Sequence, residues 1–234
     1  MNATSINSWS VFERLPQLKF KGIHRAAAML FLLLVGMIAA SAADDFFKSG
    51  VEALKQKRFD QAIVLLSKEI AKHPNNGAAY NDRGLAYFQT RQFDRAIADF
   101  SVPLRLKSDY YPAYSNRARA YAAKGDYEKA IADFSRAIQL NPRDADDHNN
   151  RGRVFAEHGQ FDKAVGDFTE AIRLKPKLVE AYINRGTAYS ALGEFDKSMQ
   201  DFQKALQVSP ADRRALDGLA AARSRQQNSN AKTP

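Results

Sequence analysis

Apolar residues recur along most of the chain at the three- and four-residue spacing that is typical of amphipathic helices. In residues 111–140, one stripe of tyrosines and alanines is followed by a second stripe of alanines, isoleucines and a phenylalanine. Gly125 and Asp126 interrupt the pattern between the two stripes, and Pro142 follows the second one. Because glycine and proline end helices, the segment predicts two helices joined by a tight turn.

The two-helix pattern occurs five times with a period of 34 residues and no insertion. The units cover residues 43–76, 77–110, 111–144, 145–178 and 179–212. An aromatic residue opens the second helix of every unit, at Phe59, Phe93, Tyr127, Phe161 and Phe195. A small residue lies in every first helix, at Gly50, Gly84, Ala118, Gly152 and Gly186. Since one helix pair cannot bury its apolar stripe alone, the units are expected to stack into a solenoid.

The sequence after the last unit continues the helical pattern. The segment "RRALDGLAAARSRQ" predicts a helix over residues 213–226. Its polar residues suit the open end of a stack, so we expect a capping helix. Residues 227–234 are expected to form a flexible tail.

These features resemble the tetratricopeptide repeat family, whose repeats have a helix–turn–helix form and the same period. In the fifth unit the family motif appears as Tyr182, Arg185-Gly186, Tyr189, Ser198, Phe202 and Pro210. The units are similar in particular to those of exported bacterial members with Asn-Arg-Gly-x-Ala-Tyr repeats. The resemblance implies an all-α fold, a right-handed α-solenoid of five repeats with a C-terminal capping helix. It also implies an adaptor that binds peptides or partner helices on a concave surface.

Four units carry an arginine where the family motif has leucine, and an aspartate follows each arginine sixteen residues later. The midpoint of each pair falls at a predicted turn, so the two residues should lie at the same height in an antiparallel hairpin. The first unit lacks both residues and has Ser49 and Leu65 instead. We therefore predict structural ion pairs, with ligand-binding arginines as the alternative. The pairs are Arg83 with Asp99, Arg117 with Asp133, Arg151 with Asp167, and Arg185 with Asp201.

Pro103 interrupts the second helix of the second unit, where the other units have glutamate or alanine. A proline inside a helix removes one backbone hydrogen bond and clashes with the preceding turn, at a cost of about 3 kcal/mol. Two interpretations remain open. Pro103 is a tolerated kink, or it is a hinge between the second and third units.

A recurring set of polar residues is expected on the face of the first helices opposite the apolar stripe. It comprises Asn116, Asn150 and Asn184, with Arg119 and Arg153 one helical turn further along. The resemblance implies that this concave face binds peptide, since asparagines hold a peptide backbone there in some family members. The alternative is that these asparagines are exposed copies left by duplication.

Residues 1–43 differ in composition from the repeats. Three basic residues precede an uncharged stretch, residues 26–43, whose strongly apolar part spans residues 29–40. This length suits a signal peptide, and the small residues at 40–43 match a cleavage site. A start near Leu18 would give a compact signal peptide, and an uncleaved anchor is the alternative. Either one predicts repeats outside the cytoplasm, periplasmic, secreted or anchored to the inner membrane.

Composition narrows the functional classes further. The chain contains no cysteine, which excludes disulfides and thiolate chemistry. The net charge is +9, but basic and acidic residues alternate along the helices. This alternation favours a solvated surface over a nucleic-acid partner.

No sequence motif for catalysis or cofactor binding is present. The stretch "DADDHNN", residues 144–150, places carboxylates beside His148, which occupies a position held by an aromatic residue in four other units. Adjacent residues on a helix point in different directions, so we predict a packing role for His148 and no metal site. We predict no enzyme and no cofactor.

The sequence thus predicts a non-catalytic scaffold of the cell envelope that binds a protein or peptide in the concave face of the solenoid. It contacts the membrane only through the N-terminal segment, and only if that segment stays uncleaved. The alternative is a structural subunit of a larger envelope complex without a peptide groove.

Overall fold

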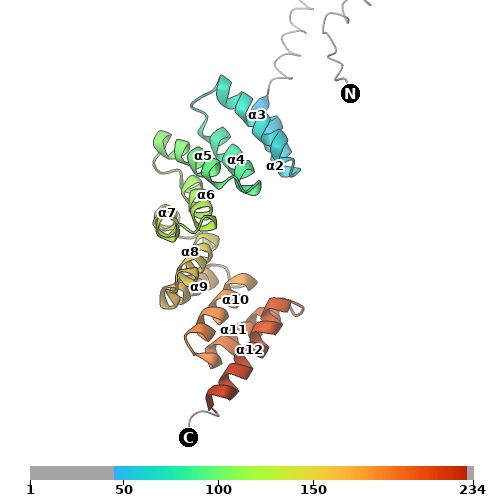
Figure 1. Cartoon of the computed structure of the whole chain (residues 1–234), viewed down its shortest axis with the longest axis vertical. Coiled ribbons are helices and arrows are strands. Elements are labelled where there is room, and N and C mark those ends of the chain that lie inside the picture. The colour runs from blue at the N-terminus through green and yellow to red at the C-terminus, as the bar shows by residue number, and fades with distance from the viewer. Residues whose placement is uncertain (1–44, 231–234) are drawn as a thin grey trace, which may run out of the picture. The chain divides into compact units, whose positions relative to one another are not determined.

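The computed structural model describes residues 45–230, so the predicted signal or anchor segment lies outside the described residues. Within this range the chain forms eleven α-helices and no strand (Figure 1). The first helices of the five units are α2 (Phe46–Lys55), α4 (Gly77–Gln89), α6 (Tyr111–Ala123), α8 (Ala145–Glu157) and α10 (Val179–Ala191). The second helices are α3 (Phe59–Lys72), α5 (Phe93–Leu106), α7 (Tyr127–Leu140), α9 (Phe161–Leu174) and α11 (Phe195–Val208), and α12 (Arg213–Asn230) follows.

Each helix packs against the next one in the chain, and the helix pairs follow one another in sequence order (Figure 1). The first helices of successive units also contact one another, from α2 with α4 through to α10 with α12. The second helices of successive units make no such contact within the described residues. The first helices therefore line the inner side of the stack, and the predicted all-α solenoid is confirmed.

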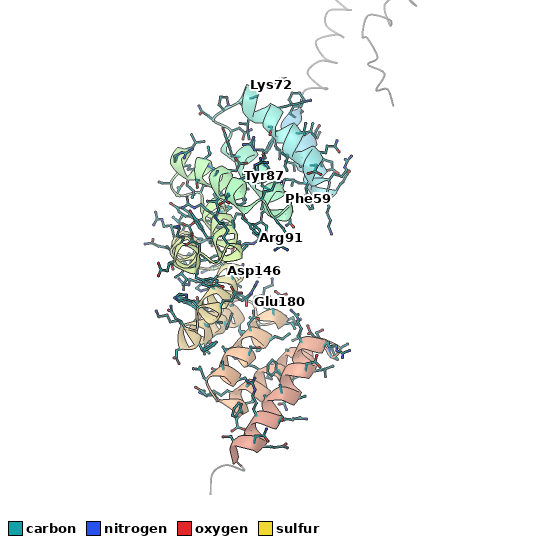
Figure 2. The ribbon with its side chains drawn as sticks, viewed as in Figure 1. Phe59, Lys72, Tyr87, Arg91, Asp146 and Glu180 are labelled. Atoms are coloured by element: carbon teal, nitrogen blue, oxygen red, sulfur yellow. The ribbon has the colours of Figure 1, made fainter. Side chains whose placement is uncertain are left out.

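The turn inside every unit contains one residue with left-handed backbone. Glycine provides it in the last three units, at Gly125, Gly159 and Gly193, with φ between 76° and 80°. Lys57 (φ 58°) and Arg91 (φ 59°) occupy this position in the first two units, and Figure 2 labels Arg91 after α4. The turn residues of the last four units are the midpoints about which the predicted arginine–aspartate pairs are symmetric.

The small residue of each first helix lies against a large apolar residue of the second helix. A Cβ atom added to Gly84 would lie 2.7 Å from a ring carbon of Phe100, and one added to Gly152 would lie 2.7 Å from Phe168. Both phenylalanines are almost completely buried. The absence of a side chain at these glycines lets the two helices of a unit approach closely enough to bury the ring.

Pro103 lies inside α5, which continues beyond it to Leu106. The proline ring is buried, and it packs near Gly77, where an added Cβ would lie 3.2 Å from the Cβ of Pro103. The backbone N–H of Lys107 still donates to the carbonyl oxygen of Pro103 at 2.8 Å. The second unit thus keeps a complete second helix around its proline.

The last helix is longer than the sequence analysis predicts. α12 ends at Asn230, so the prediction of a flexible tail is wrong for residues 227–230. Neither glycine nor proline occurs between residues 219 and 230, so nothing in this stretch stops the helix. Nε2 of Gln226 also donates to Oδ1 of Asp196 at 2.6 Å, which fixes α12 against α11.

Candidate functional site

Each of the four arginines in the leucine position contacts the aspartate sixteen residues later. Nε and Nη2 of the arginine donate to the two carboxylate oxygens at 2.7–2.9 Å, in a bidentate geometry. The arginine side chains are 17–20% exposed and the aspartates 6–11%. Both charges of each pair therefore lie largely out of water.

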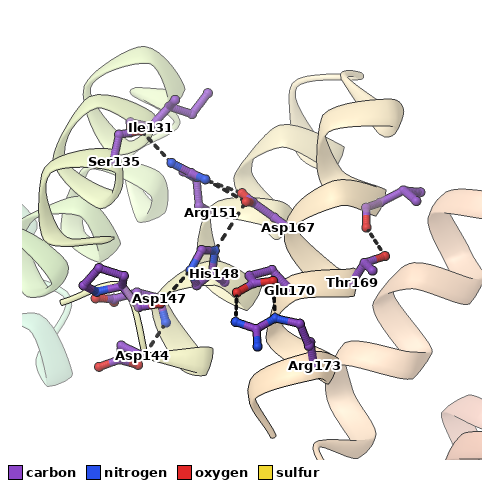
Figure 3. Close-up of polar contacts among 12 residues, drawn as sticks. Ile131, Ser135, Asp144, Asp147, His148, Arg151, Asp167, Thr169, Glu170 and Arg173 are labelled. Carbon is purple, nitrogen blue, oxygen red and sulfur yellow. Dashed lines mark hydrogen bonds and ion pairs between the residues drawn. The ribbon is translucent and has the colours of Figure 1, made fainter. Parts of the chain in front are cut away.

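A third hydrogen bond joins each arginine to the preceding unit. Nη1 donates to a hydroxyl oxygen sixteen residues earlier, at 2.9–3.0 Å. The hydroxyls belong to Ser67, Ser101, Ser135 and Thr169. Figure 3 shows Arg151 between Ser135 and Asp167. Each arginine lies on a first helix, and its guanidinium bonds both the second helix of its own unit and the second helix of the preceding unit.

This link between units was not predicted, although the sequence contains a signal for it. The hydroxyl recurs every 34 residues wherever the next unit supplies an arginine. In the fifth unit the position holds Gln203, and the arginine position that would follow holds Leu219. Hydroxyl and arginine are therefore present together or absent together.

The pKa values of these groups follow from the contacts. The hydrogen bond to its aspartate raises the pKa of Arg83, Arg117 and Arg185. Burial acts to raise the pKa of Asp167, but the hydrogen bonds from Arg151 and the nearby ring of His148 lower it below its ordinary value. Asp167 therefore stays ionised at neutral pH, and its contribution to stability is lost only when the pH falls below about 4.

His148 is buried beside the pair of the fourth unit, Arg151 with Asp167. Its Nδ1 atom lies 3.6 Å from Oδ1 of Asp167, and its Nε2 atom lies 3.3 Å from the carbonyl oxygen of Pro142 (Figure 3). Among the residues that the structure describes, no group of three histidine or acidic side chains is arranged to hold a metal ion.

The inner side of the stack contains a hollow of about 240 Å³ that brings Arg119, Asn150 and Arg153 together. Helices α6 and α8 supply these three residues, and α4 supplies Phe88. The remaining lining residues are Ala122, Ala123, Phe134, Val154 and Glu157. The hollow thus combines two guanidinium groups, one amide and the carboxylate of Glu157 with an apolar wall, and its charged side chains carry a net charge of +1.

Arg119 is the central cation of the hollow. Its guanidinium lies 5.0 Å from the ring centroid of Phe88, a cation–π distance. Within the described part of the chain it forms no ion pair and no side-chain hydrogen bond. Burial lowers the pKa of Arg119, with Asp147 acting to raise it and Arg153 to lower it. Since arginine stays protonated in proteins, this half-buried charge has no carboxylate bonded to it among the described residues.

Arg153 and Asn150, the other donor residues of the hollow, make no close hydrogen bond within the described part of the chain. Nη2 of Arg153 lies 3.9 Å from Oε1 of Glu157, and both side chains are about half exposed. The amide of Asn150 makes no side-chain hydrogen bond to any residue that the structure describes. Their donor groups are therefore available to a ligand.

Asn116 and Asn184 lie outside the lining of the hollow. Nδ2 of Asn116 donates to Oδ1 of Asn81, and Nδ2 of Asn184 donates to Oδ1 of Asn149, both at 3.0 Å. Asn81 and Asn149 are buried residues of the preceding unit. These two amides tie successive first helices together, which the sequence analysis did not foresee.

The fold defines a class of protein, an α-solenoid of stacked helix pairs whose first helices line a polar hollow. Tetratricopeptide repeat models match residues 47–111, 118–159, 152–193 and 179–212. The chain belongs to the tetratricopeptide repeat family. A comparison with curated proteins gave no significant match.

Solved structures share this fold. MamA is 28% identical, with a TM-score of 0.65 over 69% of this chain and 94% of its own. YrrB, described as a TPR protein with an unusual peptide-binding site, is 18% identical, with a TM-score of 0.64 over 78% of this chain and 95% of its own. TTC0263, a thermophilic TPR protein of Thermus thermophilus, is 24% identical, with a TM-score of 0.59 over 78% of this chain and 98% of its own.

Proposed function

We propose that this protein is a non-catalytic scaffold that binds an acidic segment of a protein partner in the hollow around Arg119. The observation that carries the proposal is the half-buried guanidinium of Arg119, which no carboxylate contacts directly in the described part of the chain. A desolvated charge is costly unless an opposite charge accompanies it, so a bound carboxylate would relieve a cost that the free protein bears. Tetratricopeptide repeats are typically scaffolds for other proteins, which agrees with this role.

The remaining groups of the hollow suit the same ligand. Arg119 and Arg153 can donate forked, charge-assisted hydrogen bonds to a carboxylate. The amide of Asn150 can donate to and accept from a peptide backbone. Phe88 and the two alanines of α6 offer apolar contact beside these groups. Affinity is expected around micromolar, about −8 kcal/mol, because an extended segment must be ordered on binding.

A direct test is calorimetric titration of the purified full chain with the blocked peptide acetyl-Glu-Ala-Glu-Ala-Glu-amide. We expect Arg119→Ala to weaken binding by about tenfold or more, since it removes the desolvated cation. The control Arg105→Ala removes an exposed arginine of α5 and should bind like the original chain. Equal affinity of the Arg119→Ala variant, or of a peptide with glutamine in place of glutamate, would contradict the proposal.

We also propose that residues 1–43 export the repeats from the cytoplasm. The proposal rests on their sequence, in which basic residues precede the apolar residues 29–40 and small residues follow. In the part of the chain that the structure describes, no helix is both long and apolar enough to cross a bilayer.

The export proposal is tested with residues 1–50 fused to a reporter that is active only outside the cytoplasm. We expect activity from this fusion and none when residues 29–40 are replaced by polar residues. N-terminal sequencing of the exported chain should begin at Ala43 or Asp44 if the signal is cleaved, whereas an intact Met1 indicates an anchor. An inactive first fusion would overturn the proposal.

A further inference from the structure

One buried carboxyl group near the hollow has no role in the contacts described so far. Asp147 lies in the first helix of the fourth unit and is 4% exposed. The corresponding position holds a completely buried alanine in the second, third and fifth units and in α12, at Ala79, Ala113, Ala181 and Ala215, and the exposed Asp45 in the first unit. The fourth unit therefore buries an ionisable group where its neighbours bury a methyl group.

Asp147 has a hydrogen-bond partner but no bonded cation. Oγ of Ser115, on α6, donates to Oδ2 of Asp147 at 2.6 Å. In the described part of the chain, no hydrogen bond or ion pair joins its carboxyl group to α7, α9 or α10. Its side chain is therefore held on the side of α6, the helix that carries Arg119.

The charged groups around Asp147 come from two helices and their flanks. The carboxylates of Asp144 and Asp146 act to raise the pKa of Asp147. His148, the next residue in the chain, acts to lower it. His148 in turn lies beside Asp167 of α9. Ser115, which bonds Asp147, lies one helical turn before Arg119 on α6, and Asp147 lies one turn before Asn150 on α8. Asp147 is therefore next to the hollow, and its charge acts on Arg119.

We propose that Asp147 makes the hollow a pH-dependent anion site, which binds a carboxylate more tightly after Asp147 has taken up a proton. This inference rests on the proposed function, because it concerns ligand binding at Arg119. An ionised Asp147 offsets part of the positive potential of Arg119 and repels a bound carboxylate, whereas a neutral Asp147 does neither. Because binding and protonation are linked, each favours the other by the same factor.

The pH range follows from the surroundings of Asp147. Burial raises the pKa of Asp147 to about 6, against the opposing effect of the hydrogen bond from Ser115. The group therefore takes up its proton between about pH 7 and pH 5, where an ordinary aspartate stays ionised. Ser115 remains a partner of the neutral form, since a hydroxyl can both donate and accept.

The test is calorimetric titration of the full chain with acetyl-Glu-Ala-Glu-Ala-Glu-amide at pH 8 and pH 5.5, where the peptide carboxylates remain largely ionised. We expect about fivefold tighter binding at pH 5.5. Asp147→Ala, which restores the residue of the neighbouring units, should bind equally well at both pH values. If that variant does not fold, Asp147→Asn keeps the shape of the side chain and is expected to give the same result.

Histidines also take up protons in this range, so His148→Tyr serves as the control with the aromatic residue of the neighbouring units. We expect this variant to keep the pH dependence. If binding requires Arg119 but is equally tight at both pH values, the proposed function stands and the role of Asp147 is overturned. Loss of the pH dependence in His148→Tyr, or its persistence in Asp147→Ala, would do the same. Absence of binding at every pH would overturn the proposed function and this inference with it.

Discussion

Replacing Arg117 with leucine should lower the free energy of unfolding by about 3 kcal/mol. The substitution leaves Asp133, which is 11% exposed, without the two hydrogen bonds that now satisfy its carboxylate. It also removes the bond from Nη1 to Ser101 in the preceding unit. Chemical denaturation of the variant measures the loss directly.

The double variant Arg117→Leu, Asp133→Leu should recover much of this loss, because it leaves no uncompensated charge. The first unit has leucine in the aspartate position, Leu65, which shows that the fold accommodates an apolar residue there. Arg105→Leu changes an exposed arginine and should stay within about 0.5 kcal/mol of the original chain. If the losses from Arg117→Leu and Asp133→Leu simply add in the double variant, the two charges are not coupled.

Gly152→Val should lower the free energy of unfolding by about 3 kcal/mol, because the unit has no room for a side chain at this position. The new Cβ would lie 2.7 Å from a ring carbon of Phe168 and 3.2 Å from the Cβ of Asp167. Relief would require the ring or the ion pair to move. Chemical denaturation should show the lower free energy of unfolding, and circular dichroism at low denaturant should show unchanged helical content.

The same substitution at Gly166 provides a matched control. Gly166 lies on the exposed face of α9, and an added Cβ would meet nothing within 4 Å. Because valine is a better helix former than glycine, Gly166→Val should raise stability by about 0.5 kcal/mol. Equal effects at the two glycines would show that close helix contact does not explain the small residue.

The fold was predictable because each unit repeats the same local evidence. The turn, the small residue and the aromatic residue recur at one period, so an atypical residue in one unit does not change the predicted fold. The length of α12 was not predictable in this way. Its last residues lack an apolar period, and they are held in part by the contact of Gln226 with Asp196, which no local pattern reveals.

The site was predictable only in part. The position of Arg151 relative to Asp167 follows from symmetry about a turn within one unit. The bond from Arg151 to Ser135 depends on how two units stack, and no symmetry within one unit indicates it. Stacking also decides that Asn150 faces the hollow while Asn184 bonds to Asn149.

The most direct test of the account exchanges charges between the hollow and its ligand. The full chain and its Arg119→Glu variant are titrated at pH 8 with acetyl-Glu-Ala-Glu-Ala-Glu-amide and with its lysine counterpart, acetyl-Lys-Ala-Lys-Ala-Lys-amide. The account predicts that Arg119→Glu loses the acidic peptide and gains affinity for the basic one, since the potential of the hollow is reversed. Unchanged affinity of Arg119→Glu for the acidic peptide would contradict it.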